Sequence, residues 1–492
     1  MTARRKSGHL GAVLLHVNGT PQGVKNIGFV LVAILLWIPF AFAELSSPLT
    51  FSSSLSSEKK ANREVYGRIR IEGMQYMTSL AEAPHLTYSQ FLSADLSYIG
   101  ETKWFENVID AGAGTFFSRS QSHIAVREIY TSPRTEGYRF YVGRKTNMWS
   151  AMDRDWNLGI WQPYFEIDAL RPEEQGLTGV FFDVNRENYQ FLSFVTPLFV
   201  PSMGPDIREE NGALISDSRW YRSPSSEMDF TNKPIPISYR LSIPEAAELA
   251  AHGGYGAMAR VGSRDHGAWM VSSYGYAPVN KLILKRNVRI PIIDPNVGVV
   301  VSPDITYHKV FSADFGYTSG DIKGTISYMQ DSPETKIPAT DWVIQKLYGI
   351  RAYSVGLEWQ APQFYSRSIF TELDYLHIEG GQIEDIGSDG RIDENTLYNQ
   401  RMKFTNAFRA RAKGELLSLF RRPLVTKVSW LYDTDQKGSM VNTEFLYYPN
   451  QMLAVIIGAD FLGVDDENTN SSNFLNQYRA NDRVYGGMSY VF

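Results

Sequence analysis

The chain has 492 residues, a formal net charge of −5, no cysteine, and 43% hydrophobic and 13% aromatic residues. The lack of cysteine excludes a disulfide-stapled secreted scaffold and a lipoprotein anchored through a thiol. The negative charge disfavours nucleic acid as a partner. After residue 43 no apolar stretch is long enough for a transmembrane helix, which excludes a helical membrane protein.

The N-terminal region has the pattern of a secretory signal. Basic residues precede an apolar run from Ile27 to Ala43, which ends in Ala-Phe-Ala just before Glu44, the first acidic residue. We therefore predict a signal peptide over 1–43, followed by a short periplasmic segment over 44–63. A membrane anchor is the alternative, although Pro39 and the small-x-small ending disfavour it.

The last ten residues alternate strictly in polarity. One face carries Val484, Gly486, Met488, Tyr490 and Phe492. This segment resembles the closing strand of Gram-negative outer-membrane β-barrel proteins, in which a terminal Phe after alternating apolar residues marks the chain for insertion. The resemblance implies the bacterial outer membrane as the location, with Tyr490 and Phe492 as the signal that the barrel-assembly machinery reads.

Alternating segments continue through 64–492, which we predict to be one all-β, transmembrane, antiparallel up-and-down barrel. The count is 18 strands, with 16 as the alternative. A soluble β-sandwich or β-helix would explain neither the terminal Phe492 nor the regular alternation of long outer and short inner connections. The expected strands are 64–77, 88–99, 104–117, 123–131, 137–145, 176–184, 188–198, 254–262, 267–276, 305–318, 322–330, 347–359, 366–379, 397–411, 424–432, 439–447, 451–461 and 482–492.

A hairpin near the start of the barrel adds a second resemblance. The run Arg127-Glu128-Ile129-Tyr130 is followed by the alternating strand Tyr138 to Lys145 and then by Trp149. It resembles a hairpin of large substrate-passing outer-membrane channels, including the alginate-export barrels, although Lys145 stands where Gln is usual. The resemblance implies a channel-like barrel and says little about its substrate.

A barrel of this size is wide enough for an aqueous channel, so charges on its inner face are candidates for pore lining and selectivity. The basic patch formed by Arg68, Arg70 and Arg483 predicts a mild preference for anions. We also expect Glu128 and Arg144 to pair across neighbouring strands. The full candidate set is Arg68, Arg70, Glu72, Glu128, Arg139, Arg144, Arg260, Lys403, Arg409, Arg411, Lys427 and Arg483.

Two long connections can narrow the lumen. The first, 146–175, carries Trp149, Trp156 and Trp161, which either stack on sugar rings or form a small core of their own. The second, 199–253, is rich in proline, and we expect it to fold into the barrel and constrict it. Packing over the outer mouth is the alternative for this second segment.

The sequence therefore predicts a porin-like channel for passive passage of small hydrophilic or acidic solutes, saccharides among them. The alternatives are an export conduit for a polysaccharide and a surface-exposed structural or adhesive barrel. We expect no enzyme, metal or cofactor, because the histidines lack metal-ligand spacing and Ser354 and His377 lack a third orienting group. Expected partners are outer-membrane lipid, lipopolysaccharide and small solutes, and a homo-oligomer stays open.

Overall fold

The computed structural model describes residues 63–80, 85–118, 121–230, 233–289, 297–364, 367–393, 400–465 and 473–492. The expected signal peptide, 1–43, lies outside the described residues, as does the segment 44–63 apart from Arg63. Within the described ranges, no helix is both long and apolar enough to cross a bilayer.

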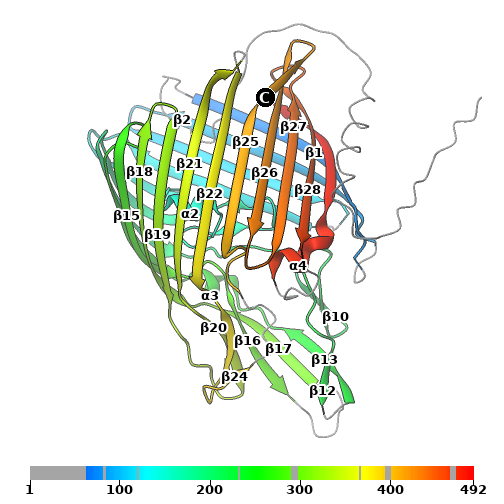
Figure 1. The fold of residues 1–492 in the computed structure, drawn as a ribbon. Helices are drawn as coiled ribbons and strands as arrows, with labels where there is room; N and C mark the ends of the chain where they lie inside the picture. Colours follow the sequence, from blue (N-terminus) through cyan, green and yellow to red (C-terminus); the bar gives the residue numbers. More distant parts are fainter. Residues whose placement is uncertain are drawn as a thin grey trace, which may run out of the picture. The chain divides into compact units, whose positions relative to one another are not determined.

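Eighteen antiparallel strands form one closed barrel, in which β1 pairs with β29 (Figure 1). The first nine are β1 (Arg63–Tyr76), β2 (Tyr88–Glu101), β3 (Phe105–Phe116), β4 (Gln121–Pro133), β5 (Arg139–Lys145), β8 (Leu177–Asn185), β9 (Tyr189–Leu198), β14 (Gly254–Val261) and β15 (Gly267–Pro278). The others are β18 (Tyr307–Ser319), β19 (Ile322–Pro333), β21 (Ile350–Phe364), β22 (Arg367–Gly380), β25 (Asn406–Leu419), β26 (Arg422–Asp433), β27 (Gly438–Tyr447), β28 (Leu453–Val464) and β29 (Arg483–Val491). The prediction of an 18-stranded all-β barrel is confirmed.

The two faces of the wall differ in polarity, as period-two alternation requires. On β1, Ile69 and Ile71 are exposed on the outer face, whereas Glu72 is buried on the inner face. A closed wall with an apolar outer face leaves no unpaired sheet edge at either end of the strand order and can face hydrocarbon all round. The chain is therefore an outer-membrane β-barrel.

The closing strand shows how the wall is completed. Phe492 exchanges backbone hydrogen bonds of 2.9 Å with Gly67 of β1, and its ring is 59% exposed on the outer face. A Cβ on Gly67 would lie 2.4 Å from that ring, so only glycine leaves room for it. Tyr490 is exposed on the same face. The expected outward, lipid-facing positions of Tyr490 and Phe492 are thus those that the structure has.

One predicted strand is displaced. The segment expected over 397–411 is found as β25 at Asn406–Leu419, while 400–405 belongs to the preceding connection. Thr405 and Asn406 donate backbone hydrogen bonds to Asp433, which ends β26, and these bonds fix where the strand begins. Lys403 therefore lies on a loop and not on the barrel wall.

Long connections at the end away from the C-terminus build a second sheet (Figure 1). Its strands, in spatial order, are β12 (Glu227–Phe230), β13 (Lys233–Leu241), β17 (Val297–Asp304), β16 (Ile283–Arg289), β20 (Trp342–Leu347), β23 (Ile383–Gly387) and β24 (Ile392–Asp393). We call it the outer sheet. The segment 199–253, expected to constrict the lumen, supplies β12 and β13 to it. The same segment also forms a separate two-stranded sheet, β10 (Arg208–Glu210) with β11 (Ala213–Ile215), and the helix α3 (Ala246–Ala250). This corrects that expectation.

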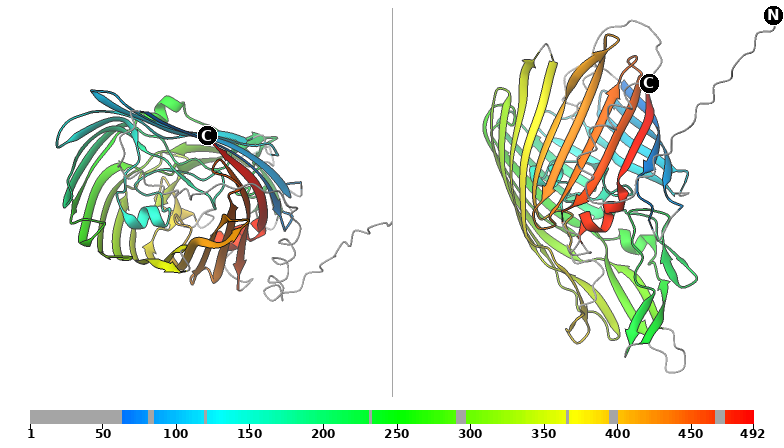
Figure 2. Two further views of the ribbon diagram at one scale, coloured as in Figure 1. Left: turned by 90° about the horizontal axis from the view of Figure 1, so that it is seen from above. Right: turned by 45° about the vertical axis from the view of Figure 1, so that its right-hand side comes forward.

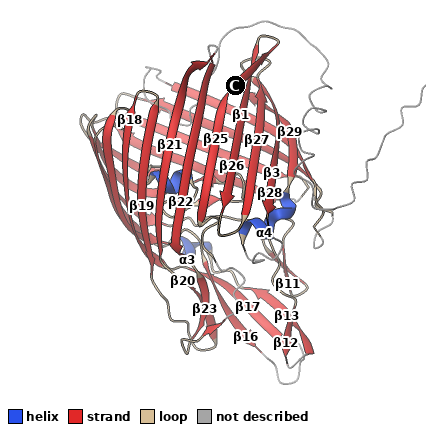
Figure 3. Cartoon of the chain, viewed as in Figure 1, coloured by secondary structure: helices blue, strands red, loops and turns tan. Residues whose placement is uncertain are grey.

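A different connection enters the barrel. Residues 146–176, here called the inner loop, join β5 to β8 and contain α2 (Ala151–Asp155), β6 (Tyr164–Phe165) and β7 (Glu173–Glu174). The end-on view in Figure 2 places α2 inside the ring of strands, and Figure 3 shows it at mid-height of the wall. The inner loop therefore determines how much of the lumen stays open.

Candidate functional site

One side of the inner loop is an aromatic core. Trp149 and Trp161 stack with ring centroids 5.5 Å apart, and Trp156 and Met152 are buried beside them. They pack against inward-facing apolar side chains of the wall, among them Tyr141, Phe181, Leu192, Phe194, Met258, Trp269, Val271, Val310, Met329, Ile350, Leu376 and Leu431. The wall residues named here belong to ten of the eighteen barrel strands, so one side of the lumen is lined by packed apolar groups.

Hydrogen bonds from the wall fix this side of the loop. The carbonyl of Trp149 accepts from Ser273 Oγ at 2.7 Å, and the Ala151 N–H donates to Asp314 Oδ2 at 2.7 Å. The guanidinium of Arg409 lies 4.3 Å from the centre of the Trp156 ring. Because these partners come from β15, β18 and β25, α2 is held from several directions.

Asp153 organises the turn after α2. Its carboxylate accepts the backbone N–H groups of Ile160 at 2.9 Å and Trp161 at 3.1 Å. Burial raises the pKa of Asp153 to about 7, and the charges of Glu174 and Asp331 add to the rise while the two N–H groups oppose it. Protonation of this one carboxyl is therefore coupled to the packing of the loop near neutral pH.

The opposite side of the inner loop is charged. Glu166 lies 3.2 Å from Lys403 Nζ and 3.7 Å from Lys281 Nζ. Burial alone would raise the pKa of Glu166, but the two ammonium groups lower it to about 2. Lys403, expected on the wall, also donates to the carbonyl of Ala169 at 3.0 Å. It therefore holds the loop rather than lining a strand.

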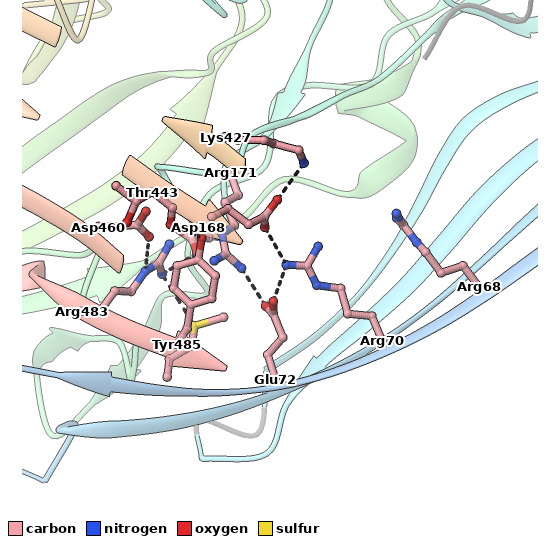
Figure 4. Close-up of polar contacts among 12 residues, drawn as sticks. Arg68, Arg70, Glu72, Asp168, Arg171, Lys427, Thr443, Asp460, Arg483 and Tyr485 are labelled. Atoms are coloured by element: carbon pink, nitrogen blue, oxygen red, sulfur yellow. Dashed lines mark hydrogen bonds and ion pairs between the residues drawn. The ribbon is translucent and has the colours of Figure 1, made fainter. Parts of the chain in front are cut away.

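Two arginines connect the end of the inner loop to the wall where β29 closes the barrel against β1 (Figure 4). Arg483 is fully buried and bridges Asp168 of the loop, at 2.6 Å, to Asp460 of β28, at 2.7 Å. Arg171 of the loop lies 2.7 Å from Glu72 of β1. Hence Arg483 and Glu72, predicted to line a pore, are structural links between loop and wall.

The wall beside these links carries a chain of alternating charges. Arg68 pairs with Asp95 at 2.8 Å, and Arg127 pairs with Asp95 at 3.0 Å and with Asp110 at 2.7 Å. A second chain runs from Lys427 through Glu444, at 2.7 Å, to Arg70, which also contacts Glu72 (Figure 4). The side chains of Arg68 and Lys427 remain partly exposed.

A cavity of about 270 Å³ lies between this wall and residues 165–173 of the inner loop. One part of its lining is apolar and aromatic, and the other part is charged and polar. The lining side chains are those of Arg68, Arg70, Met74, Phe91, Ser93, Asp95, Ala113, Phe116, His123, Arg127, Phe165, Ile167, Asp168, Arg171, Pro172 and Glu173. Such a mixed lining suits a small polar solute that also has an apolar face.

The remaining predicted charges lie at three places on the wall. Arg409 and Arg411 of β25 form a cluster with Glu372 and Asp374 of β22, in which Arg409 is 2.9 Å from Asp374. Arg260 donates to carbonyls of the short β8–β9 turn and to Asn185. Arg139 is exposed and lies 3.5 Å from Glu106.

The expected ion pair between Glu128 and Arg144 does not form. Glu128 accepts hydrogen bonds from the N–H and the hydroxyl of Thr146, while Arg144 donates to Gln175 Oε1 at 3.5 Å. The cause is a bulge in β4, where the register shifts between Asp110 and Ala111 of β3. Glu128 therefore points inward, whereas Arg144 lies opposite the outward-facing Ile129.

The three predicted sugar-stacking tryptophans are not available to a ligand. Trp149 is 1% exposed, and Trp156 and Trp161 are each 6% exposed. The alternative predicted for these tryptophans was a small core of their own, and they are buried in such a core. Stacking on a saccharide would require the inner loop to leave the wall.

Sequence reasoning missed Arg127, Asp168 and Arg171. Strict alternation from the inward-facing Glu128 would put Arg127 on the lipid side, but the β4 bulge turns it to the lumen. A buried-charge argument against a lipid-facing arginine would have found it. For Asp168 and Arg171 no signal exists in a single sequence, because the partner of Asp168, Arg483, is 315 residues away and the partner of Arg171, Glu72, is 99 residues away.

The arrangement offers no serine–histidine pair of the type considered from the sequence. Ser354 is the register partner of Leu376, and His377 is that of Tyr353. Neighbouring residues of a strand face opposite sides, so Ser354 faces the lumen and His377 stacks on the outward-facing Tyr353. Among the described residues, no cluster of His, Asp and Glu could hold a metal ion.

No protein-family model and no curated protein matches the chain. Solved outer-membrane barrels are similar in fold at low sequence identity. OmpF of Salmonella typhi, in complex with daunomycin, has 10% identity and a TM-score of 0.38, covering 87% of this chain and 97% of its own. A loop-deletion mutant of OmpT of Vibrio cholerae has 9% identity and a TM-score of 0.37, covering 87% and 99%. Wzi of Escherichia coli, described as a carbohydrate-binding β-barrel involved in group 1 capsule assembly, has 8% identity and a TM-score of 0.39, covering 86% and 84%.

Proposed function

We propose that this protein is a narrow, porin-like channel of the bacterial outer membrane for small hydrophilic solutes. The observation that carries the proposal is the division of the lumen by the inner loop into two unequal environments. The tryptophan side is packed and held by buried hydrogen bonds. The arginine side contains the 270 Å³ cavity, and its wall charges Arg68 and Lys427 are partly exposed. Solutes pass on the arginine side.

The charges on this route support weak anion preference. Four guanidinium groups line the cavity, against the three carboxylates Asp95, Asp168 and Glu173. Most of these charges are paired with one another, so the net field is small. Small acidic solutes, saccharides among them, are favoured over cations of the same size by a modest factor.

Reversal potentials across a planar bilayer test this function. The full chain is inserted, a tenfold gradient of potassium chloride is imposed, and the permeability ratio is measured. We expect a small open conductance and a chloride-to-potassium ratio of about 2 to 4. Substitution of Arg127 by Gln leaves Asp95 and Asp110 with fewer partners and should lower the ratio below that of the wild type. A clear cation preference, or no conductance at all, contradicts the proposal.

A surface-binding barrel is the second candidate, and the outer sheet is the observation that favours it. Seven strands from four connections make a platform at the end away from the C-terminus. On its apolar side Leu214 and Tyr221 pack against Val297, Val299 and Val301 of β17, so the sheet has a small core of its own. Removal of part of this sheet should abolish surface binding and leave conductance unchanged. If the protein is a channel, removal of the inner loop should instead change the conductance.

A further inference from the structure

The two faces of the outer sheet differ in chemistry. Register partners in a sheet point to the same side, and successive residues of a strand point to opposite sides. The apolar face carries Val297, Val299 and Val301 of β17, which are buried. Gly298 and Val300, which alternate with them, therefore belong to the opposite face.

Three cations surround Gly298 and Val300 on that opposite face. Arg240 of β13 is the register partner of Val300, and Arg289 of β16 is that of Gly298. Lys285 lies four residues before Arg289 on β16 and therefore points to the same side. β13 and β16 flank β17, so their cations are two strand spacings apart, about 10 Å. We call this surface, formed by Arg240, Lys285, Arg289, Gly298 and Val300, the basic face.

The cations of the basic face have no carboxylate partner among the described residues. The side chains of Arg240 and Arg289 are exposed. Arg289 Nε donates to Asn287 Oδ1 at 3.0 Å, and the ammonium group of Lys285 lies 5.5 Å from the centre of the Trp342 ring. Both of these contacts are with neutral groups. The positive charge of the basic face is thus left for a ligand.

Carboxylates of the neighbouring elements are engaged elsewhere or lie at the margin. Glu209 of β10 accepts the backbone N–H of Leu241 at 2.9 Å. Glu384 of β23 accepts the hydroxyl of Tyr348, and Glu227 belongs to the edge strand β12. The centre of the basic face, over β13, β17 and β16, therefore keeps a positive field.

The floor between the cations is open. A Cβ built on Gly298 would have a single described atom within 4 Å, the carbonyl oxygen of Arg289 at 3.9 Å. Ser238, the register partner of Gly298 on β13, is exposed. An extended chain can therefore lie flat across the three strands and approach the backbone.

We propose that the basic face binds an acidic glycan, a chain of sugars that carry carboxylates. A guanidinium presents planar donors that match a carboxylate, and cations spread over two strand spacings suit a repeating polyanion better than one small anion. Sugar hydroxyls can bond to Ser238 and Asn287, and the partly exposed ring of Trp342 offers an apolar surface at the margin. The inference gives the surface-binding candidate a ligand class and holds whether or not the lumen conducts.

Isothermal titration calorimetry of the full chain in a neutral detergent tests the proposal. The probe is an oligogalacturonate long enough to reach from β13 to β16. Its methyl ester keeps the sugar rings and removes the charges, whereas polyglutamate keeps the charges and removes the rings. We expect the oligogalacturonate to bind at least tenfold more tightly than the ester and several-fold more tightly than polyglutamate. Equal binding of acid and ester, tighter binding of polyglutamate, or no binding of the oligogalacturonate overturns the proposal.

Variants locate the site. Arg240→Gln and Arg289→Gln should each weaken oligogalacturonate binding about tenfold, and Arg240→Lys, which keeps the charge, should weaken it less. Arg391→Gln is the matched control, because Arg391 lies beside β24 of the same sheet, is exposed and already pairs with Asp389 at 3.3 Å. All four variants should conduct like the wild type, which separates loss of glycan binding from loss of the channel. If Arg391→Gln weakens binding as much as Arg240→Gln, the basic face is not the site.

Discussion

At the scale of single residues, buried charges do the work of attaching the inner loop to the wall. Arg483 joins Asp168 of the loop to Asp460 of β28, and Glu166 of the loop lies between Lys403 and Lys281. A buried ion pair contributes little net stability compared with apolar side chains of the same shape, but removal of one partner leaves an uncompensated charge. These residues therefore specify where the loop lies more than they add to overall stability.

Replacement of Arg483 by Gln should destabilise the protein by about 3–5 kcal/mol, because Asp168 and Asp460 would remain buried without their cation. Urea unfolding in lipid vesicles, followed by tryptophan fluorescence, measures the change. Arg208→Gln is the control, because Arg208 and its partner Asp217 are both exposed and their pairing should leave the midpoint unchanged. Equal midpoints for wild type and the Arg483 variant would contradict the account of this bridge.

Asp153 predicts a pH dependence of the inner loop. Its folded-state pKa of about 7 lies above the value of about 3.9 for an unfolded chain. The stabilisation is therefore complete below about pH 4 and is lost as the pH rises through 7. Amide exchange at Ile160 and Trp161, whose N–H groups the carboxylate accepts, should accelerate from pH 5 to pH 8 beyond the intrinsic change.

The control for this titration is Asp153→Asn, which keeps an oxygen acceptor and removes the proton equilibrium. In that variant the protection of the two amides should not change between pH 5 and pH 8. A wild type whose protection rises with pH would show that the ionised form is the favoured one and would contradict the assignment.

At the scale of elements, the strands were predictable and the connections were not. Each strand shows the alternation of its own residues, so the ends of β19 and β28 could be placed to within three residues. The bulge in β4 and the late start of β25 depend on hydrogen bonds to other strands, and alternation alone cannot show them. Which long connection enters the lumen is decided by partners such as Ser273 and Asp314, over 100 residues away along the chain.

At the same scale, the short β4–β5 pairing requires a glycine. Gly143 has a φ of 132°, and a Cβ there would lie 2.2 Å from the carbonyl oxygen of Ile129. Gly143→Val should therefore break the short β4–β5 joint and reduce the fraction of heat-modifiable, folded barrel several-fold. Gly324→Val is the control, because no atom lies within 4 Å of a Cβ on Gly324 of β19. A Gly143 variant that folds as well as this control would refute the close approach.

At the scale of the whole barrel, the wall follows one rule that every strand repeats, whereas the lumen depends on residues specific to this chain. The wall could be predicted because every strand repeats one rule, lipid on one face and lumen on the other. The charged half of the lumen was foreseen in part, through Arg68, Arg70 and Lys427. Its other contributors, Arg171 and Asp168, come from the inner loop, and only the folded chain brings them to β1 and β29.

The most direct measurement of the central claim is the single-channel conductance of a barrel without its inner loop. Lys145 and Leu177 are register partners, so a two-residue Asn-Gly turn can replace 146–176 and leave a plain hairpin. A matched control shortens the outer sheet between the register partners Glu227 and Pro236. We predict that the first variant conducts at least several-fold more than the wild type, while the control conducts like the wild type. Equal conductance of wild type and loop-less barrel would contradict the claim that the inner loop sets the open cross-section of the lumen.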